Sequence, residues 1–180
     1  MKFSLPALVT AIVVSLPAQA SDNFYAGIGA TRAGRVSFAP GVSSANGHLS
    51  LTGYGGYNFS DSFAIEAGFG DAGSYQSAGL GAQYKLDASR WYIAAKGTVS
   101  LGEKWSLAGK VGVDRYSFDL STPSGQADIV STRLMYGLGL GYQLSEKLAL
   151  TLEAEYAGKT RAPNLMLTHR RLQAGLRYAF

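Results

Sequence analysis

The chain has 180 residues, with 16 lysines and arginines against 12 aspartates and glutamates, which gives a net charge of +4. It has no cysteine, so it can form neither disulfides nor thiolate metal sites. Its basic residues are scattered along the chain, which argues against a nucleic-acid partner. Glycine and tyrosine are abundant, with 23 and 11 copies, and this composition suits closely packed strands that carry aromatic residues near their ends.

The N-terminus has the pattern of a secretory signal peptide. Lys2 is followed by an apolar run over residues 5–16 and then by the small-x-small sequence Ala18-Gln19-Ala20. The run is too short to span about 30 Å of hydrocarbon as a helix. We therefore expect residues 1–20 to be removed on export and residues 21–180 to form one domain.

Short polar turns recur three times along the rest of the chain. Segments 56–65, 98–107 and 141–150 each contain a large apolar residue, a polar turn with an acid near its centre, and a second large apolar residue. The acids are Asp61, Glu103 and Glu146. Each turn joins two long alternating segments, which favours a meander of antiparallel strands over a solenoid.

Strands placed around these turns number eight, over residues 23–31, 48–59, 63–70, 90–101, 104–118, 130–144, 147–157 and 168–180. Most reach the ~9–11 residues that a membrane-spanning strand needs. We predict an all-β protein, an eight-stranded antiparallel up-and-down transmembrane β-barrel. The three turns would face the periplasm, and longer outer loops would cover residues 32–47, 71–89, 119–129 and 158–167. Because residues 78–86 also alternate, we expect either an extended loop or a strand extension over 71–89.

The alternation separates a lipid-facing side from a lumen-facing side in each strand. Over residues 133–143, leucines and tyrosines occupy one parity and Arg133, glycines and Gln143 the other. Aromatic residues near strand ends predict two girdles, a periplasmic one (Phe59, Phe63, Trp105 and Phe180) and an outer one (Phe69, Trp91 and Tyr156). Arg115 has outward parity, so we expect it at the outer rim or after a bulge.

Charged residues of both signs have lumen-facing parity. The candidates for lumen ion pairs are Glu66, Lys96, Lys110, Asp114, Arg133, Glu153, Glu155, Arg171 and Arg177. Glu66 and Lys96 lie equally far from their turns on neighbouring strands, as do Asp114 and Arg133, so we expect each pair to meet. An eight-stranded barrel is just wide enough for side chains to fill it. This favours a plugged polar core, and the alternative is a narrow pore gated by rearrangement of an ion pair.

The last strand alternates up to the terminal aromatic residue. Leu176, Tyr178 and Phe180 share one face and resemble the signal that the outer-membrane assembly machinery reads, so we expect them to contact that machinery. Together with the tandem hairpins, segments 105–113, 136–142 and 176–180 resemble the transmembrane domain of OmpA-type outer-membrane proteins. This resemblance implies the bacterial outer membrane and a role as anchor, adhesin, small pore or surface antigen. Full-length members also carry a C-terminal peptidoglycan-binding domain. We expect none here, because the last predicted strand ends with residue 180.

Two further surface features concern function. His48-Leu49-Ser50 has the spacing of the His-x-Ser pair of one lipid A deacylase type, but no acid lies nearby to orient the base. We therefore expect no catalytic residue, cofactor or metal, and we keep a lipid A-modifying enzyme as a third hypothesis. Basic residues near the outer rim are expected to contact phosphates of lipopolysaccharide as charge-assisted donors; these are Arg32, Arg35, Lys159, Arg161 and Arg170. The sequence thus favours a structural or surface-interaction barrel.

Overall fold

The computed structural model describes residues 23–32, 37–38, 49–79, 82–122, 125–162 and 165–180, and all of its regular elements there are strands. These are β1 (Phe24–Arg32), β2 (Ser37–Phe38), β3 (Leu49–Ser60), β4 (Phe63–Gly79), β5 (Ala82–Ser100), β6 (Trp105–Thr122), β7 (Gly125–Gln143), β8 (Leu148–Ala162) and β9 (Leu165–Ala179). No helix in this described part of the chain is long and apolar enough to cross a membrane.

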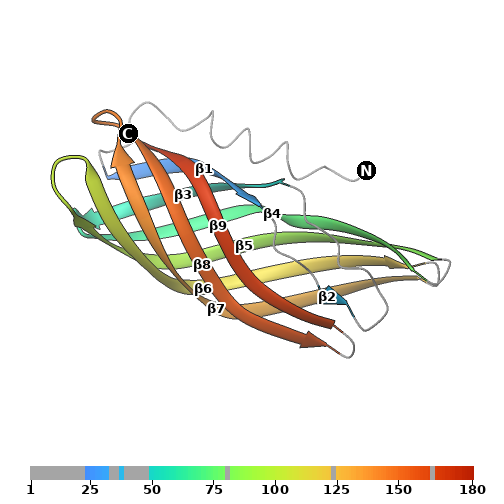
Figure 1. The fold of residues 1–180 in the computed structure, drawn as a ribbon. Helices are drawn as coiled ribbons and strands as arrows, with labels where there is room; N and C mark the ends of the chain where they lie inside the picture. Colours follow the sequence, from blue (N-terminus) through green and yellow to red (C-terminus); the bar gives the residue numbers. More distant parts are fainter. Residues whose placement is uncertain (1–22, 33–36, 39–48, 80–81, 123–124, 163–164) are drawn as a thin grey trace, which may run out of the picture.

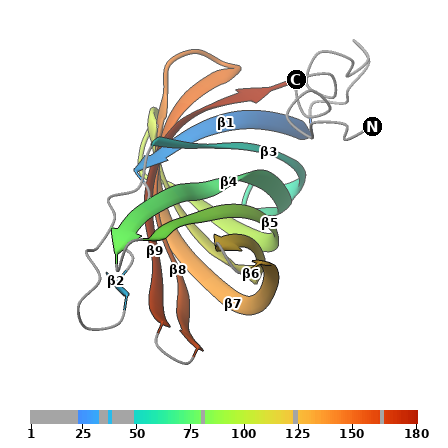
Figure 2. The same cartoon turned by 90° about the vertical axis from the view of Figure 1, so that its right-hand side faces the viewer.

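Eight of the strands close into a barrel (Figure 1, Figure 2). Strands β3 to β9 pair antiparallel in chain order, β1 pairs with β3, and β1 also pairs with β9. This closing register runs from Tyr25 opposite Ala179 to Thr31 opposite Gln173. The two residues of β2 pair with the start of β9, before the part of β9 that pairs with β1. The predicted eight-stranded antiparallel barrel is confirmed.

The three polar turns lie together at one end of the barrel, the end at which the C-terminus also lies (Figure 1). They connect β3 to β4, β5 to β6, and β7 to β8. The Leu101 amide donates to the carbonyl of Trp105 at 2.7 Å, and the Leu144 amide donates to that of Leu148 at 2.8 Å. In an outer-membrane barrel this end with short turns faces the periplasm.

The strands at the opposite end are longer than the sequence predicted. Strands β4 and β5 stay paired as far as Gly79 opposite Ala82, so residues 71–79 and 82–89 form the strand extension. The loops predicted over 119–129 and 158–167 are wrong, because pairing continues to Thr122 opposite Gly125 and to Ala162 opposite Leu165. Strands above the membrane have no lipid-facing side, so their alternation need not continue that of the membrane strand: in β5 the apolar Tyr84 and Leu86 share the parity of the lumen residue Tyr92. The outer loop predicted over residues 32–47 lies mostly outside the described residues, because residues 33–36 and 39–48 are not among them.

Two bulges bend these extensions. The register shifts between Asp71 and Gly73 in β4 and between Tyr156 and Lys159 in β8. Gly73 and Gly158 have φ angles of 118° and 78°, a left-handed conformation that favours glycine. Strands β7 and β8 pair only up to Tyr136 opposite Tyr156. Beyond that pair, the β8–β9 hairpin diverges from β7 (Figure 1, Figure 2).

The outer surface of the barrel is apolar and its lumen is filled. Leu134 and Leu138 are 73% and 67% exposed, whereas Met135 between them is fully buried. Among the predicted girdle residues, Phe59 and Phe63 contact each other at 5.7 Å between ring centroids. Arg115 is exposed and lies opposite the outer-girdle residue Trp91, in a strand whose register has no bulge. Its register with Trp91 therefore places Arg115 at the level of the outer girdle, and its exposure agrees with its outward parity.

Tyrosine rings in the lumen lie against glycines of the neighbouring strand. In each case the two residues are direct partners in the antiparallel register, and a Cβ on the glycine would approach the ring to 2.2–2.4 Å. The pairs are Tyr25 with Gly56, Tyr54 with Gly27, and Tyr92 with Gly68. The glycines thus make room for rings lying flat along the wall, an arrangement that stabilises glycine-containing sheets.

A valine in place of Gly68 should therefore lower barrel stability. Its Cβ would lie 2.4 Å from the Tyr92 ring, so the ring must leave its position. We expect the free energy of unfolding to fall by about 1–3 kcal/mol, as for other overpacked cores. Urea titration of the refolded barrel, followed by tryptophan fluorescence, measures this change.

Gly109→Val is the matched control for Gly68→Val. A Cβ on Gly109 meets no atom within 4 Å, so we expect a change within about 0.5 kcal/mol. Equal losses in both variants would show that the Tyr92–Gly68 contact does not matter for stability.

Candidate functional site: the charged lumen

The centre of the lumen is a carboxylate with four hydrogen-bond donors. Glu66 is 1% exposed. It accepts from the hydroxyls of Tyr25 and Tyr92, each at 2.8 Å, and from Nζ of Lys96 at 3.0 Å and Lys110 at 2.7 Å. Four donors use the full acceptor capacity of a carboxylate. The predicted Glu66–Lys96 ion pair is thus present in the structure.

Two lysines face each other across this carboxylate. Lys96 of β5 and Lys110 of β6 are direct register partners, a placement that is destabilising for like charges. Glu153 of β8 compensates for it, because it forms ion pairs with Lys110 and, at 3.5 Å, with Lys96. Glu155 adds a third acid to Lys110 at 3.3 Å. The lysines are therefore held together by carboxylates on both sides.

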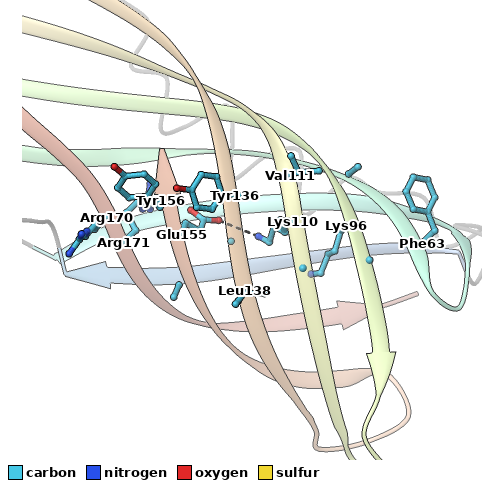
Figure 3. Close-up of a pocket in the computed structure, with 15 residues that line it drawn as sticks. Phe63, Lys96, Lys110, Val111, Tyr136, Leu138, Glu155, Tyr156, Arg170 and Arg171 are labelled. Atoms are coloured by element: carbon cyan, nitrogen blue, oxygen red, sulfur yellow. Dashed lines mark hydrogen bonds and ion pairs between the residues drawn. The ribbon is translucent and has the colours of Figure 1, made fainter. Parts of the chain in front are cut away.

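These ion pairs cross the lumen from wall to wall. In the closed ring, β4 and β8 are separated by three strands in either direction, so they lie on opposite walls. Glu66 comes from β4 and Glu153 from β8, and both bond to Lys110 of β6. All three side chains are buried. Figure 3 shows Lys96, Lys110 and Glu155 approaching one another from different strands.

A second cluster, nearer the extended end, is organised by a residue that the sequence analysis missed. Arg90 is 1% exposed, and its Nε donates to both carboxylate oxygens of Asp114, at 2.7 and 2.8 Å. Its Nη2 donates to Glu155 at 2.8 Å. The sequence predicts Arg90 as the first residue of a strand, whereas β5 begins at Ala82. The shared parity of Arg90, Tyr92 and Lys96 was the signal that could have identified it.

The predicted pair of Asp114 and Arg133 is wrong. The two residues are register partners, yet no ion pair joins them among the described side chains. Asp114 is bonded to Arg90, whereas Nε of Arg133 donates to the hydroxyl of Ser131 at 3.2 Å. Arg133 is only half-buried, so water competes for it more than for Arg90.

The remaining lumen candidates bond to neutral groups. Nη2 of Arg171 donates to the hydroxyls of Thr52 at 2.9 Å and Thr31 at 3.3 Å. The guanidinium of Arg177 lies 5.5 Å from the ring centroid of Tyr25. It also lines a polar cavity of about 330 Å³ at the end with the short turns. Neither arginine forms an ion pair within the described part of the chain.

The candidates outside the lumen are described only in part. Arg170 is exposed, and its guanidinium lies 5.9 Å from the ring centroid of Tyr156. The side chains of Arg32, Lys159 and Arg161, and all of Arg35, lie outside the described residues. In the predicted assembly signal, Leu176 and Tyr178 are exposed, and the Phe180 amide donates to the carbonyl of Phe24 at 3.0 Å.

The described residues show no assembled catalytic or metal site. Ser50 is buried and its hydroxyl has no hydrogen-bond partner among them, while His48 lies outside the described ranges. No group of three or more histidine or acidic residues in these ranges is placed to hold a metal ion. What the lumen does offer is a buried ionic network whose members can exchange partners, above all Lys110.

Removing the charge of Glu66 should destabilise the barrel strongly. Glu66→Gln leaves Lys96 and Lys110 opposed with one shared carboxylate fewer, and breaking a buried pair costs about 3–5 kcal/mol. Urea unfolding of the refolded protein measures this loss. Asp61→Asn in an exposed turn is the control, and it should change stability by less than about 0.5 kcal/mol. A Glu66→Gln barrel as stable as the control would contradict the importance of this carboxylate.

Comparison with solved structures finds the same fold in several small bacterial barrels. OprG from Pseudomonas aeruginosa has a TM-score of 0.66 at 17% identity, covering 88% of this chain and 96% of that one. Neisserial surface protein A has a TM-score of 0.63 at 18% identity, covering 89% and 98%. Ail, the attachment invasion locus protein of Yersinia pestis, has a TM-score of 0.59 at 18% identity, covering 88% and 100%. At these identities the likeness concerns the fold alone.

No curated protein sequence matches this chain. The sequence pattern of one family, described as the outer membrane protein beta-barrel domain, matches residues 7–180. The span of this match agrees with the closed ring of eight strands and with the apolar outer surface of the barrel. The chain therefore belongs to the outer membrane β-barrel family, whose place is the bacterial outer membrane.

Proposed function

We propose that this protein acts through its outer surface, as a structural and surface-interaction barrel whose lumen is closed at rest. The observation that carries this proposal is the bridge Glu66–Lys110–Glu153, which joins opposite walls of the lumen. Above and below it, tyrosines and Arg90 fill the same space. A lumen occupied in this way favours a solid support for the hairpins above the membrane over a permanent channel.

Lipopolysaccharide is the proposed partner at the outer rim. Arg170 is exposed at the level where β8 and β9 leave the barrel wall, and Lys159 and Arg161 follow in the same hairpin. Arginine binds phosphate through paired, charge-assisted hydrogen bonds. The assembly machinery is the proposed partner of Leu176, Tyr178 and Phe180 during biogenesis, since two of these side chains stay exposed on the last strand.

A narrow gated pore is the second candidate function, and one observation favours it. Lys110 has three acidic partners within 3.3 Å, so it can move from Glu66 to Glu155 without losing its charge compensation. Such an exchange would break the Lys110 bridge and leave the longer one through Lys96, which lies 3.0 Å from Glu66 and 3.5 Å from Glu153. A gate of this kind needs no movement of the barrel backbone.

Planar-bilayer conductance distinguishes the two functions. We expect the refolded wild-type protein to give no steady openings, because the bridge excludes a continuous water path. Heat-modifiable migration on gels establishes that the barrel has folded. Reproducible wild-type openings that change in a Glu66→Ala, Lys96→Ala double variant would contradict the closed barrel and support the gated pore.

Charge removal at the rim tests the lipopolysaccharide contact. We expect the triple variant Lys159→Gln, Arg161→Gln, Arg170→Gln to bind lipopolysaccharide about tenfold more weakly, since each lost phosphate bond is worth about 1.5–3 kcal/mol before water replaces it. Fluorescence titration of the refolded barrel with labelled lipopolysaccharide measures the affinity. Lys104→Gln, in an exposed turn at the other end, should leave it unchanged. Equal affinities for all three proteins would remove lipopolysaccharide as the rim partner.

A further inference from the structure

The lipid-facing wall of the barrel carries a long groove. Its volume is about 1050 Å³, and most of its lining side chains have outward parity. Figure 3 shows Phe63 at one end of the lining residues and Arg170 at the other, with Tyr136 and Tyr156 near Arg170. The groove therefore faces the hydrocarbon of the membrane rather than the lumen.

Small residues make the floor of this groove. Gly97 of β5 and Gly109 of β6 are direct register partners and both face outward, and Ala154 lies in the same row on the far side of Leu138. A Cβ on Gly109 would meet no atom within 4 Å, so nothing in the protein requires a glycine there. Val111 in the neighbouring row and Leu138 between Gly109 and Ala154 are both exposed, and they stand above these small residues. The wall is thus recessed between apolar side chains.

The groove climbs from the periplasmic end to the outer end. Its lining follows two neighbouring rows of register partners, one containing Gly97, Gly109 and Ala154, the other running from Ala95 to Arg170. Gly109 is four residues from the start of β6, whereas Arg170 is ten residues from the chain end at the same side. At about 3.3 Å per residue and a tilt of roughly 40°, Arg170 lies about 15 Å higher than the floor.

We infer that this groove holds an acyl chain of lipid A, with a phosphate of the same molecule at Arg170. This inference rests on the proposed contact with lipopolysaccharide and deepens it. The charge at Arg170 selects the occupant: a cation at the outer end of an apolar groove fits a lipid of the outer leaflet whose anionic headgroup lies at that height. Apolar lining below and a guanidinium above match the two halves of that lipid.

A second lipid-facing groove provides the internal comparison. Its volume is about 650 Å³, and its lining includes Phe24, Tyr57, Phe69 and Trp91. No lysine or arginine is among its lining residues. A general preference of acyl chains for recessed walls would fill both grooves, whereas recognition of an anionic lipid selects the one whose lining includes an arginine; Arg115, opposite Trp91, is not among the lining residues of the second groove.

The experiment fills each groove and counts bound lipid. Refolded wild-type protein and variants are incubated with hexa-acylated lipid A, and native mass spectrometry measures lipid retained per barrel; phosphatidylglycerol is the competing probe. We expect one tightly held lipid A on the wild-type barrel and at least a fivefold loss of affinity in Gly97→Leu, Gly109→Leu. Gly55→Leu, in the second groove, should bind as the wild type does. If the double variant fails to fold, Gly109→Leu alone replaces it, because its Cβ has open space.

Comparing Arg170→Gln with the groove-filling variants distinguishes the proposed acyl-chain site from the proposed phosphate contact at the rim. If Arg170→Gln weakens lipid A binding and the filled groove does not, the acyl-chain site is overturned while the rim contact stands. If neither variant weakens binding, both are overturned. Retention of phosphatidylglycerol as tight as that of lipid A, lost equally on filling, would show a site for any acyl chain and overturn the assignment to lipid A.

Discussion

The structure depends on one requirement, that every backbone donor and acceptor within the hydrocarbon has a partner inside the protein. The register between β1 and β9 meets it, because it removes the last two free edges of the sheet. Closure with eight strands then fixes the width of the lumen, and strand alternation sends every second side chain into it. Polar residues excluded from lipid must therefore be accommodated in a space that side chains fill completely.

Burial in that space forces the charges to compensate one another. The buried charged side chains of the described residues are four acids, Glu66, Asp114, Glu153 and Glu155, and three bases, Arg90, Lys96 and Lys110, with the half-buried Arg171 beside them. An unpaired charge in such a core would cost several kcal/mol. The bonds from Tyr25 and Tyr92 to Glu66 depend in turn on glycines opposite the rings. The same residue type thus has two uses, since inside it admits tyrosines and outside, at Gly97 and Gly109, it recesses the wall.

The sequence was sufficient where a feature follows from parity and distance to a turn. The barrel, the end with the short turns and the Glu66–Lys96 pair are of this kind, because register is inherited directly from a tight turn. Arg90 and the hairpins above the membrane were not predictable in this way. In β5 the apolar residues change parity, from Tyr84 and Leu86 to Trp91 and Ile93, so the sequence predicts a strand that starts only at Arg90. Asp114 shows the second limit, since parity brings it beside Arg133 but cannot decide between that arginine and Arg90.

A plugged lumen and a gated lumen differ in whether Lys110 can exchange one acidic partner for another. Moving it away from Glu66 leaves that carboxylate with Lys96 and two tyrosine donors, and moving it away from Glu153 leaves an acid whose other lysine is 3.5 Å distant. Either step breaks the Lys110 link between β4 and β8 and leaves only the link through Lys96, yet either step keeps Lys110 beside an acid. The barrier to opening is therefore set by the lost compensation of one glutamate rather than by exposure of a lysine. In the proposed closed barrel, any opening must supply a new donor, water included, to the glutamate that is left behind.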